Sequence, residues 1–278
     1  MAEPLFSVDV CGEFTEGQVV IHWRDEPRPS QAALDRLIMD TWASLSQESQ
    51  AEGRWLYNGG LLRYLRHRLE NGKLLIEAGP TDYAAFMATN YLNPHRAEEF
   101  GWASYSHPIG ISATVITADG WLLYGRRNEK VACMAGYAHT FGGTLEPGEM
   151  LPDGTYDAFA GLRRELDEEL GLQENEIERL ICLGMIRDGR IRQPELIFDA
   201  YVRLPKSDMV GRIRPDRPHE EHTEVLACRD EPQAILPFIR ATPRIAPILV
   251  GALIHHGRYR FGSAWYMQAK KYLKNPLR

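Results

Sequence analysis

Residues 164–172 read RELDEELGL, and this stretch indicates both a fold and a chemistry. On a helix, Glu165, Glu168 and Glu169 stand at positions i, i+3 and i+4, so all three carboxylates project from one face. Like charges one turn apart repel each other and destabilise a helix. The cluster becomes favourable around Mg²⁺, because this ion prefers carboxylate oxygens and bridges to substrate phosphates. The alternative interpretation is a solvated acidic face on a surface helix.

The sequence around these carboxylates favours a metal site over a solvated face. Leu162 and Leu166 belong to an apolar stripe beside the acidic face, which would dock the helix on a sheet. Gly171 is a typical residue for ending a helix, and Gly142-Gly143 upstream suggests a turn that lets the backbone approach closely. The pattern R-E-x-x-E-E-x-G would arise by chance in a chain of this length with odds on the order of 1 in 1,000 or less.

The segment that runs from Gly143 to Leu172 resembles the Nudix box, G-x₅-E-x₇-R-E-U-x-E-E-x-G-U, in which U is a bulky apolar residue. Gly143 and Glu149 match its first half, and residues 164–172 match its second half. The resemblance implies a hydrolase of the Nudix superfamily. It also implies a mixed-sheet α/β/α sandwich, in which the box forms a loop, a helix and a second loop.

The resemblance also implies roles for the residues of the box. In the family, the three helix carboxylates and the backbone carbonyl at the Gly143 position bind Mg²⁺, with Mn²⁺ as the alternative ion. The residues that match Glu149 and Arg164 pair with each other and brace the loop. The chain departs from the family pattern in one place, because fourteen residues, 150–163, separate Glu149 from Arg164 where the pattern has seven. We therefore expect a looped insertion before the helix, which puts the role of Glu149 in question.

A second similarity covers roughly residues 55–230 and rests on scattered positions. Over this stretch the chain resembles the Nudix hydrolases that act on UDP-glucose and UDP-galactose, which also carry an N-terminal domain and a lengthened box. This resemblance implies hydrolysis of such a sugar nucleotide to UMP and a sugar 1-phosphate. The matching stretches are Thr81-x-Tyr83-x-x-Phe86-x-x-Thr89-Asn90, Gly125-Arg126-Arg127-Asn128 and Glu221-x-Thr223.

Other functions stay open at this point. A Nudix box also fits a pyrophosphatase that acts on ADP-ribose or on a dinucleotide. A Nudix-like sensor would bind a nucleotide without hydrolysing it; loss of the box carboxylates would favour a sensor, and the chain keeps all of them. A protein-interaction scaffold would rest only on the unassigned N-terminal segment.

Five residues outside the box are candidates for the substrate site. Arg126 and Arg127 end a predicted strand and can contact a phosphate through two hydrogen bonds, although arginines are also common at exposed strand ends. Glu221 follows the second strand pair, where the resemblance places a general base or a further metal ligand; a solvated acidic loop is the alternative. Tyr83 and Asn90 would help to hold a base or sugar, unless this helical face belongs to the core.

Composition limits the partners of the chain. It has 278 residues, a net charge of −6 and a pI of about 5.9, whereas a general binder of nucleic acids or anionic membranes needs a basic face. We therefore expect a small nucleoside diphosphate derivative as partner, and neither nucleic acid nor a membrane. The longest apolar stretch, residues 245–254, is too short to span a bilayer. Four cysteines without a C-x-x-C pair indicate reduced thiols and a cytoplasmic protein.

The order of predicted elements indicates two domains, of which residues 1–105 form the smaller, an N-terminal α+β domain. Two strands, at residues 5–10 and 18–23, precede a helix with Ser30 as its N-cap. An Asn-Gly pair at 71–72, between two apolar runs, then predicts a hairpin.

Residues 106–278 are predicted to form the Nudix hydrolase domain with a helical C-terminal tail. Prolines and glycines among the mixed polar residues 91–108 place the boundary. An Asp-Gly pair at 119–120 predicts a second hairpin, and the box helix is expected over residues 155–170. The tail at 233–273 has a largely helical pattern. Strands on both sides of one central helix fit a mixed α/β sandwich.

Overall fold

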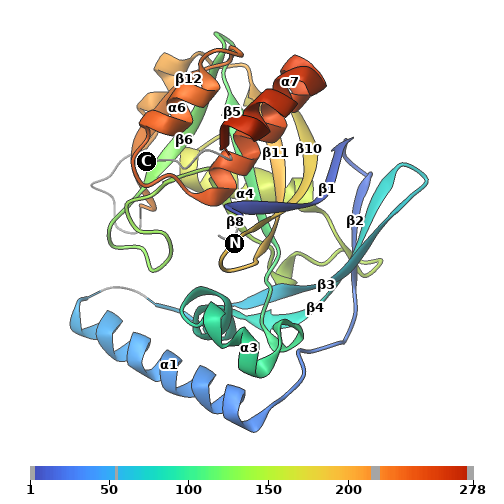
Figure 1. Ribbon diagram of the computed structural model, residues 1–278, viewed down its shortest axis with the longest axis vertical. Helices are drawn as coiled ribbons and strands as arrows, with labels where there is room; N and C mark the ends of the chain where they lie inside the picture. The colour runs from blue at the N-terminus through green and yellow to red at the C-terminus, as the bar shows by residue number, and fades with distance from the viewer. Residues whose placement is uncertain (1–3, 54–55, 214–219, 274–278) are drawn as a thin grey trace.

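The computed structural model describes residues 4–53, 56–213 and 220–273 (Figure 1). Its largest unit is an eight-stranded mixed sheet in the order β1-β10-β11-β5-β6-β12, with β7 paired to β6 and β8 paired to β5. The β11–β5 pair is parallel, and the other pairs are antiparallel. The strands of this large sheet are β1 (Phe6–Phe14), β5 (Gly110–Ile116), β6 (Trp121–Arg127), β7 (Ala138–His139), β8 (Phe141–Thr144), β10 (Ile177–Asp188), β11 (Pro194–Val202) and β12 (His222–Arg229).

A second, smaller sheet has four strands in the order β3-β4-β2-β9. The predicted Asn-Gly hairpin forms its β3–β4 pair, and both turn residues have positive φ, 50° at Asn71 and 73° at Gly72. This geometry is that of a type I′ turn, whose twist matches the twist of the two strands. The strands are β2 (Val19–Trp23), β3 (Gly60–Glu70), β4 (Lys73–Asp82) and β9 (Thr155–Tyr156).

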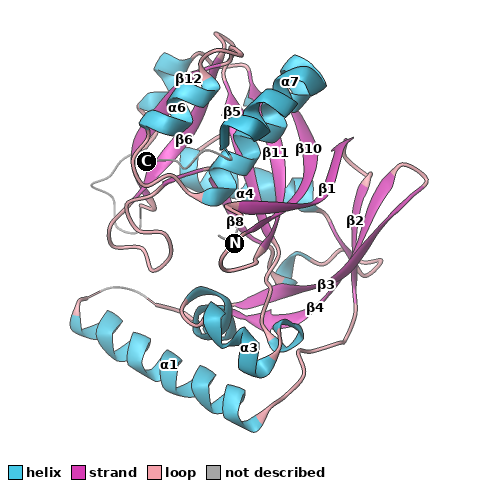
Figure 2. Cartoon of the chain, in the orientation of Figure 1, coloured by secondary structure: helices cyan, strands magenta, loops and turns pink. Residues whose placement is uncertain are grey.

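Helices cover both faces of the large sheet, which confirms the predicted mixed-sheet α/β/α sandwich (Figure 2). The longer helices are α1 (Ala32–Ala51), α4 (Ala158–Leu170), α6 (Ile235–Ala241) and α7 (Pro247–Leu273), and the shorter ones are α2 (Tyr83–Phe86), η1 (Met87–Tyr91), η2 (Pro94–Arg96), α3 (Ala97–Phe100), η3 (Trp102–Ser104), η4 (Pro147–Glu149), η5 (Glu174–Glu176) and α5 (Lys206–Val210). On one face, Leu166 of α4 packs in the same core cluster as Ile111 of β5. On the other face, Leu249 of α7 packs in a cluster with Tyr124 of β6.

The C-terminal tail is helical, as its pattern predicts. Helices α6 and α7 account for most of residues 235–273, and Gly262, with φ 84° and ψ 179°, interrupts α7. Among the described residues, no helix combines the length and the apolar character that crossing a bilayer requires.

One hydrophobic core joins the two sheets. Val10 of the large sheet and Ile21 and Leu62 of the small sheet are fully buried or nearly so. All three belong to the cluster that contains Leu166 of the box helix. The small sheet therefore packs on the same face of the large sheet as the box helix.

Two strands pair with strands from the other side of the predicted domain boundary near residue 105. Strand β1 comes from the N-terminal segment but pairs with β10 in the large sheet, where Val8 is opposite Ile186. Strand β9 comes from the expected insertion in the box but pairs with β2 in the small sheet, where Ile21 is opposite Tyr156. The division into two domains stays a prediction. Each of the two segments contributes one strand to the sheet that is formed mainly by the other segment.

Two expected helix starts are wrong, the box helix by three residues and α1 by one. The box helix begins at Ala158 rather than Thr155, because Thr155 and its neighbour pair with β2. Asp157 caps the helix instead, and its side chain accepts a hydrogen bond from the backbone N–H of Phe159 at 2.8 Å. Ser30 is not the cap of α1, because its hydroxyl donates to Asp35 at 2.6 Å and Gln31 occupies the N-cap position.

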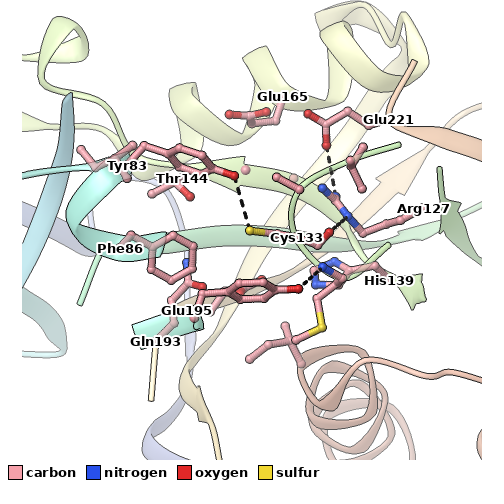
Figure 3. A pocket seen from close by; sticks show the side chains of 18 of the residues that line it. Tyr83, Phe86, Arg127, Cys133, His139, Thr144, Glu165, Gln193, Glu195 and Glu221 are labelled. Atoms are coloured by element: carbon pink, nitrogen blue, oxygen red, sulfur yellow. Dashed lines mark hydrogen bonds and ion pairs between the residues drawn. The ribbon is translucent and has the colours of Figure 1, made fainter. Parts of the chain in front are cut away.

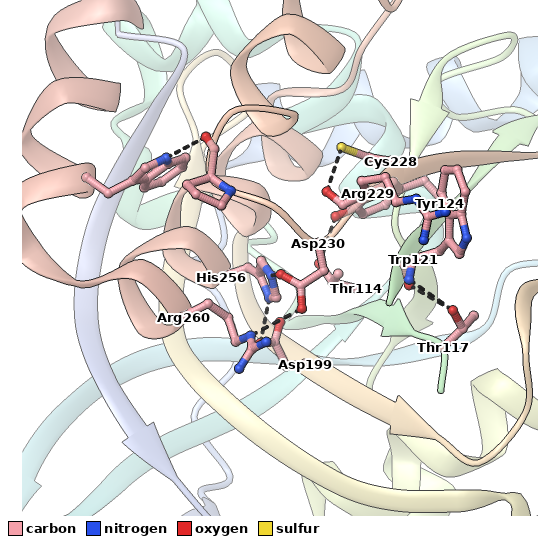
Figure 4. Close-up of polar contacts among 12 residues, drawn as sticks. Thr114, Thr117, Trp121, Tyr124, Asp199, Cys228, Arg229, Asp230, His256 and Arg260 are labelled. Atoms are coloured by element: carbon pink, nitrogen blue, oxygen red, sulfur yellow. Dashed lines mark hydrogen bonds and ion pairs between the residues drawn. The ribbon is translucent and has the colours of Figure 1, made fainter. Parts of the chain in front are cut away.

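A buried cluster of charged and polar groups ties α7 to the large sheet (Figure 4). The two ring nitrogens of His256 lie 2.8 Å from an Asp199 carboxylate oxygen and 3.0 Å from an Asp230 oxygen. Burial alone would lower the pKa of His256, but the charges and hydrogen bonds of the two aspartates outweigh it and raise the pKa to about 9. The charged imidazole is therefore held by two carboxylates.

We expect this cluster to make the stability of the protein fall in mildly alkaline solution. A raised pKa stabilises the folded state fully below the unfolded value of about 6.5, and the contribution disappears as the pH rises through about 9. The loss between these limits should be on the order of 3 kcal/mol. Urea unfolding at a series of pH values measures it. His256→Gln should be less stable near pH 6.5 and should show a flatter profile; a mutant profile parallel to that of the wild type would contradict this account.

Candidate active site

A cavity of about 550 Å³ lies where the small sheet and its short helices meet the box (Figure 3). Gly143 of β8 and Glu165 of α4 line one part of it, and Tyr83 of α2 faces them from the N-terminal segment. Glu195 at the start of β11 lines another part, together with Ile248 at the start of α7. The cavity is thus built from segments that lie far apart in the sequence.

Gly142 and Gly143 provide the close approach that the sequence suggests. Gly142 has φ 145°, and a Cβ there would lie 2.1 Å from the carbonyl oxygen of Ile111. A Cβ on Gly143 would lie 2.3 Å from a carboxylate oxygen of Glu165. A side chain at Gly142 would push the loop away from the sheet, because the obstructing atom belongs to the backbone, whereas a side chain at Gly143 would displace the Glu165 carboxylate.

The three box carboxylates have different surroundings. The carboxylates of Glu165 and Glu168 line the cavity, and Arg164 lies 2.7 Å from Glu165 and 3.0 Å from Glu168. Glu169 is buried beneath them and accepts a hydrogen bond from the Gly142 N–H at 2.7 Å. Its other oxygen lies 3.0 Å from Nε2 of His222, a residue of β12 that is fully buried.

The electrostatics of these carboxylates fit a divalent cation. Burial raises the pKa of Glu165 to about 8 against the effect of Arg164, and the charges of Glu169 and Glu168 add to the rise. Burial also raises the pKa of Glu169 well above its ordinary value, and the charge of Glu221 contributes. A bound cation would offset both the desolvation and the mutual repulsion.

The type and position of the candidate ligand atoms also suit a divalent cation. Every candidate ligand is an oxygen, as Mg²⁺ prefers, and the absence of a side chain on Gly143 leaves the Glu165 carboxylate against the loop backbone. In the part of the chain that the structure describes, no group of three His, Cys, Asp or Glu side chains already converges on one point. Arg164 links Glu165 to Glu168, and Glu169 is turned toward Gly142, so binding of an ion would require these side chains to move.

Arg127 and Glu221 face each other in the lining of the cavity, as Figure 3 shows. The guanidinium of Arg127 lies 3.1 Å from Glu221 and donates to the backbone carbonyl of Cys133 at 3.0 Å. Asn128 holds the strand end to the loop, because its N–H donates to the carbonyl of Glu221 at 2.7 Å. The side chain of Glu221 is about half exposed, so a ligand can reach it.

Two other sequence candidates do not line the cavity. Arg126, beside Arg127 on β6, lies 3.3 Å from Glu224 and donates to the carbonyl of Pro243 at 2.9 Å. Asn90 is fully buried, where it donates to the carbonyl of Ile191 at 2.8 Å. Asn90 therefore supports Ile191 of the cavity lining from behind, and Arg126 lies outside the cavity.

Comparison with solved structures gives matches of low overall similarity. The structure of DR0079 from Deinococcus radiodurans has a TM-score of 0.38 at 15% identity and covers 52% of this chain and 80% of its own. The MutT protein from Methanosarcina mazei Go1 has a TM-score of 0.36 at 18% identity and covers 55% of this chain and 94% of its own. No family model matches the chain.

The sequence has three relatives that share one name, uridine diphosphate glucose pyrophosphatase NUDT22. The bovine protein is 25% identical over 257 residues, which cover 82% of this chain and 87% of the relative. The human protein is 27% identical over 136 residues and the mouse protein 24% identical over 175 residues. These two alignments cover 45% and 56% of the relatives, about half of their length. The chain is related to the Nudix hydrolases. The resemblance expected from the sequence is confirmed.

The insertion in the Nudix box has a structural role that the sequence did not reveal. Residues 150–157 connect η4 to the box helix, and within them Thr155 and Tyr156 form β9 at the edge of the small sheet. The box is thereby fastened to the N-terminal segment immediately before its helix begins. The side chain of Glu149 lies outside the described residues, so its pairing with Arg164 stays a prediction.

Several residues that line or support the cavity were not chosen as site residues from the sequence. His222 stands beside Glu221, and the one available signal was Gly125 on the neighbouring strand, where a Cβ would lie 2.1 Å from the imidazole. Tyr91 lines the cavity, and its hydroxyl accepts a hydrogen bond from the Met134 N–H at 2.8 Å. Glu195 had no local signal, because it becomes visible only once β11 is placed beside β5.

Proposed function

We propose that the chain hydrolyses the diphosphate bond of a nucleoside diphosphate derivative, and that UDP-glucose or UDP-galactose is the substrate. Water would attack one phosphorus and the bond to the bridging oxygen would break, which gives UMP and a sugar 1-phosphate. The observation that carries this proposal is that Glu165, Glu168, Arg127 and an aromatic wall line the same cavity. The name of the three relatives supports the choice of a UDP-sugar.

Mg²⁺ would be held by the carboxylates of Glu165, Glu168 and Glu169 and by the carbonyl of Gly143. When bound, such an ion neutralises phosphate charge and makes water a better nucleophile. The residues of the chain would supply the rest of the chemistry.

Arg127 would hold the diphosphate. Its guanidinium is held by Glu221 and by the carbonyl of Cys133, and the residue lines the cavity. A fixed guanidinium binds phosphate oxygens with good geometry and no large loss of side-chain freedom. Tyr83 and Phe86 form an apolar wall beside this position and would exclude water from the unreactive part of the substrate.

Glu221 would act as the general base. It faces Arg127 in the cavity lining and is about half exposed, so a water molecule can reach it. Glu221→Gln should therefore lower kcat by roughly 10²-fold and change KM much less. Glu224→Gln is a matched control, because Glu224 pairs with Arg126 outside the cavity. Steady-state kinetics on UDP-glucose measure both variants, and equal kcat values for the two would remove Glu221 from this role.

Product chromatography tests the proposed reaction itself. With Mg²⁺, UDP-glucose should yield UMP and glucose 1-phosphate in equal amounts, and an excess of EDTA should stop the reaction. Binding of UDP-glucose without any turnover would overturn the enzymatic proposal in favour of a nucleotide sensor.

A further inference from the structure

Glu195 lies across the cavity from the box carboxylates. Figure 3 shows Glu165 and Glu195 on opposite sides, with Tyr83 and Phe86 along the wall that joins them. Glu195 pairs with Gly110 in the parallel ladder between β11 and β5, and a Cβ on Gly110 would lie 3.0 Å from its carboxylate. The glycine thus makes room for the carboxyl group at this position.

The carboxyl group of Glu195 is held in an unfavourable environment. The residue is 6% exposed and forms no ion pair with any residue in the described ranges. Burial raises its pKa to about 7; Ser112 and Arg127 oppose this rise, while the charge of Asp188 adds to it. A buried carboxyl without a cationic partner costs stability unless hydrogen-bond donors reach it. The open side of this carboxyl group faces the cavity, so a ligand can supply the donors.

The surfaces near Glu195 suit a neutral ligand group. Phe86, Tyr91 and Ile248 line the cavity with ring faces and aliphatic surface, and Gln193 adds an amide beside the carboxyl group. Such walls pack against a flat base or a sugar ring. A phosphate placed here would meet the Glu195 carboxylate and be repelled.

We propose that Glu195 is a specificity-determining residue, which accepts hydrogen bonds from the hydroxyl groups of the sugar and rejects a terminal phosphate. This inference rests on the proposed function, because the box side of the cavity must hold the diphosphate. A UDP-sugar carries hexose hydroxyls beyond its diphosphate, whereas UTP carries a charged phosphate in the same place.

Two variants separate the roles of charge and hydrogen bonding. Glu195→Gln removes the charge and keeps an acceptor, whereas Glu195→Leu removes both at similar volume. Calorimetric titration without divalent metal gives the Kd of UDP-glucose and of UTP for each protein. We expect Glu195→Leu to weaken UDP-glucose binding about tenfold or more. We expect both variants to shift the UTP-to-UDP-glucose affinity ratio toward UTP by about tenfold.

Titration with the two products tests this placement. We expect the Leu variant to bind glucose 1-phosphate more weakly and UMP as the wild type does; weaker binding of UMP alone would place Glu195 at uracil and overturn the inference. Unchanged binding of both products, or an unchanged ratio for UTP and UDP-glucose, would overturn the inference. So would a fall in kcat at unchanged KM and Kd, because that result would place Glu195 in the chemical step. A purely structural residue would lower Tm without moving the affinity ratio.

The binding measurements do not depend on hydrolysis. If the wild-type protein binds UDP-glucose but does not cleave it, the proposed function fails while the role of Glu195 is still decided by the affinity ratio. If cleavage occurs and the ratio does not change, the proposed function stands and the inference on Glu195 fails.

Discussion

Glu168→Gln is expected to lower kcat for UDP-glucose by roughly 10²-fold or more, which corresponds to a few kcal/mol of transition-state stabilisation. Glu168 is an exposed cavity residue, so the substitution should leave the fold intact. The amide would remove one negative ligand from the proposed Mg²⁺ site. Glu165→Gln should have an effect at least as large, because Glu165 is more deeply buried and lies against Gly143.

A matched control lies on the same helix. Asp167→Asn makes the same change of charge, but Asp167 accepts a hydrogen bond from Gln173 at 2.7 Å and does not line the cavity. Its kcat should stay close to that of the wild type. Raising the Mg²⁺ concentration should recover part of the activity of Glu168→Gln. Full activity of both box variants, or of the wild type in EDTA, would contradict the role given to the box.

A chain that begins at Ser106 is expected to lose its cooperative fold and all measurable activity. The deletion would remove β1 from the edge of the large sheet and leave β9 without β2. It would also remove Val10, Ile21 and Leu62 from the core that supports the box helix. The free energy lost with so many buried side chains exceeds the free energy of unfolding of an ordinary domain, since one large-to-small core substitution already costs about 2–5 kcal/mol.

Circular dichroism and urea unfolding of the truncated chain measure this effect. Addition of residues 1–105 as a separate polypeptide should restore part of the structure, because the missing strands would be available again. A soluble truncated chain that unfolds cooperatively and keeps its kcat/KM would show that the N-terminal segment builds neither the core nor the site.

Much of the fold was predictable because its signals are local. The turn at Asn71-Gly72, the box helix that ends at Gly171 and the helical tail each depend on a short pattern. The pairings of β1 with β10 and of β9 with β2 are not encoded in any short pattern. Strand β9 has only two residues, Thr155 and Tyr156, and is a strand because Ile21 lies opposite. Tertiary contacts thus decided where the box helix begins.

The residues of the candidate site likewise fall into those that a local pattern predicts and those that depend on tertiary contacts. Glu165, Glu168 and Glu221 belong to recognisable patterns, and the structure places all three at the cavity. Arg126 and Asn90 were chosen from equally good patterns, but their partners are backbone carbonyls and Glu224, which no sequence pattern predicts. Glu195 is a single acid before the apolar run of β11. Its place in the cavity depends on the register between β11 and β5.

The most direct test of the proposed function compares UDP-glucose with ADP-ribose. Both are incubated with Mg²⁺ and the protein at equal concentration, and the release of UMP or AMP is followed by chromatography. The account predicts a higher kcat/KM for UDP-glucose, with UMP and glucose 1-phosphate as products. Turnover of ADP-ribose that is tenfold faster or more would contradict it.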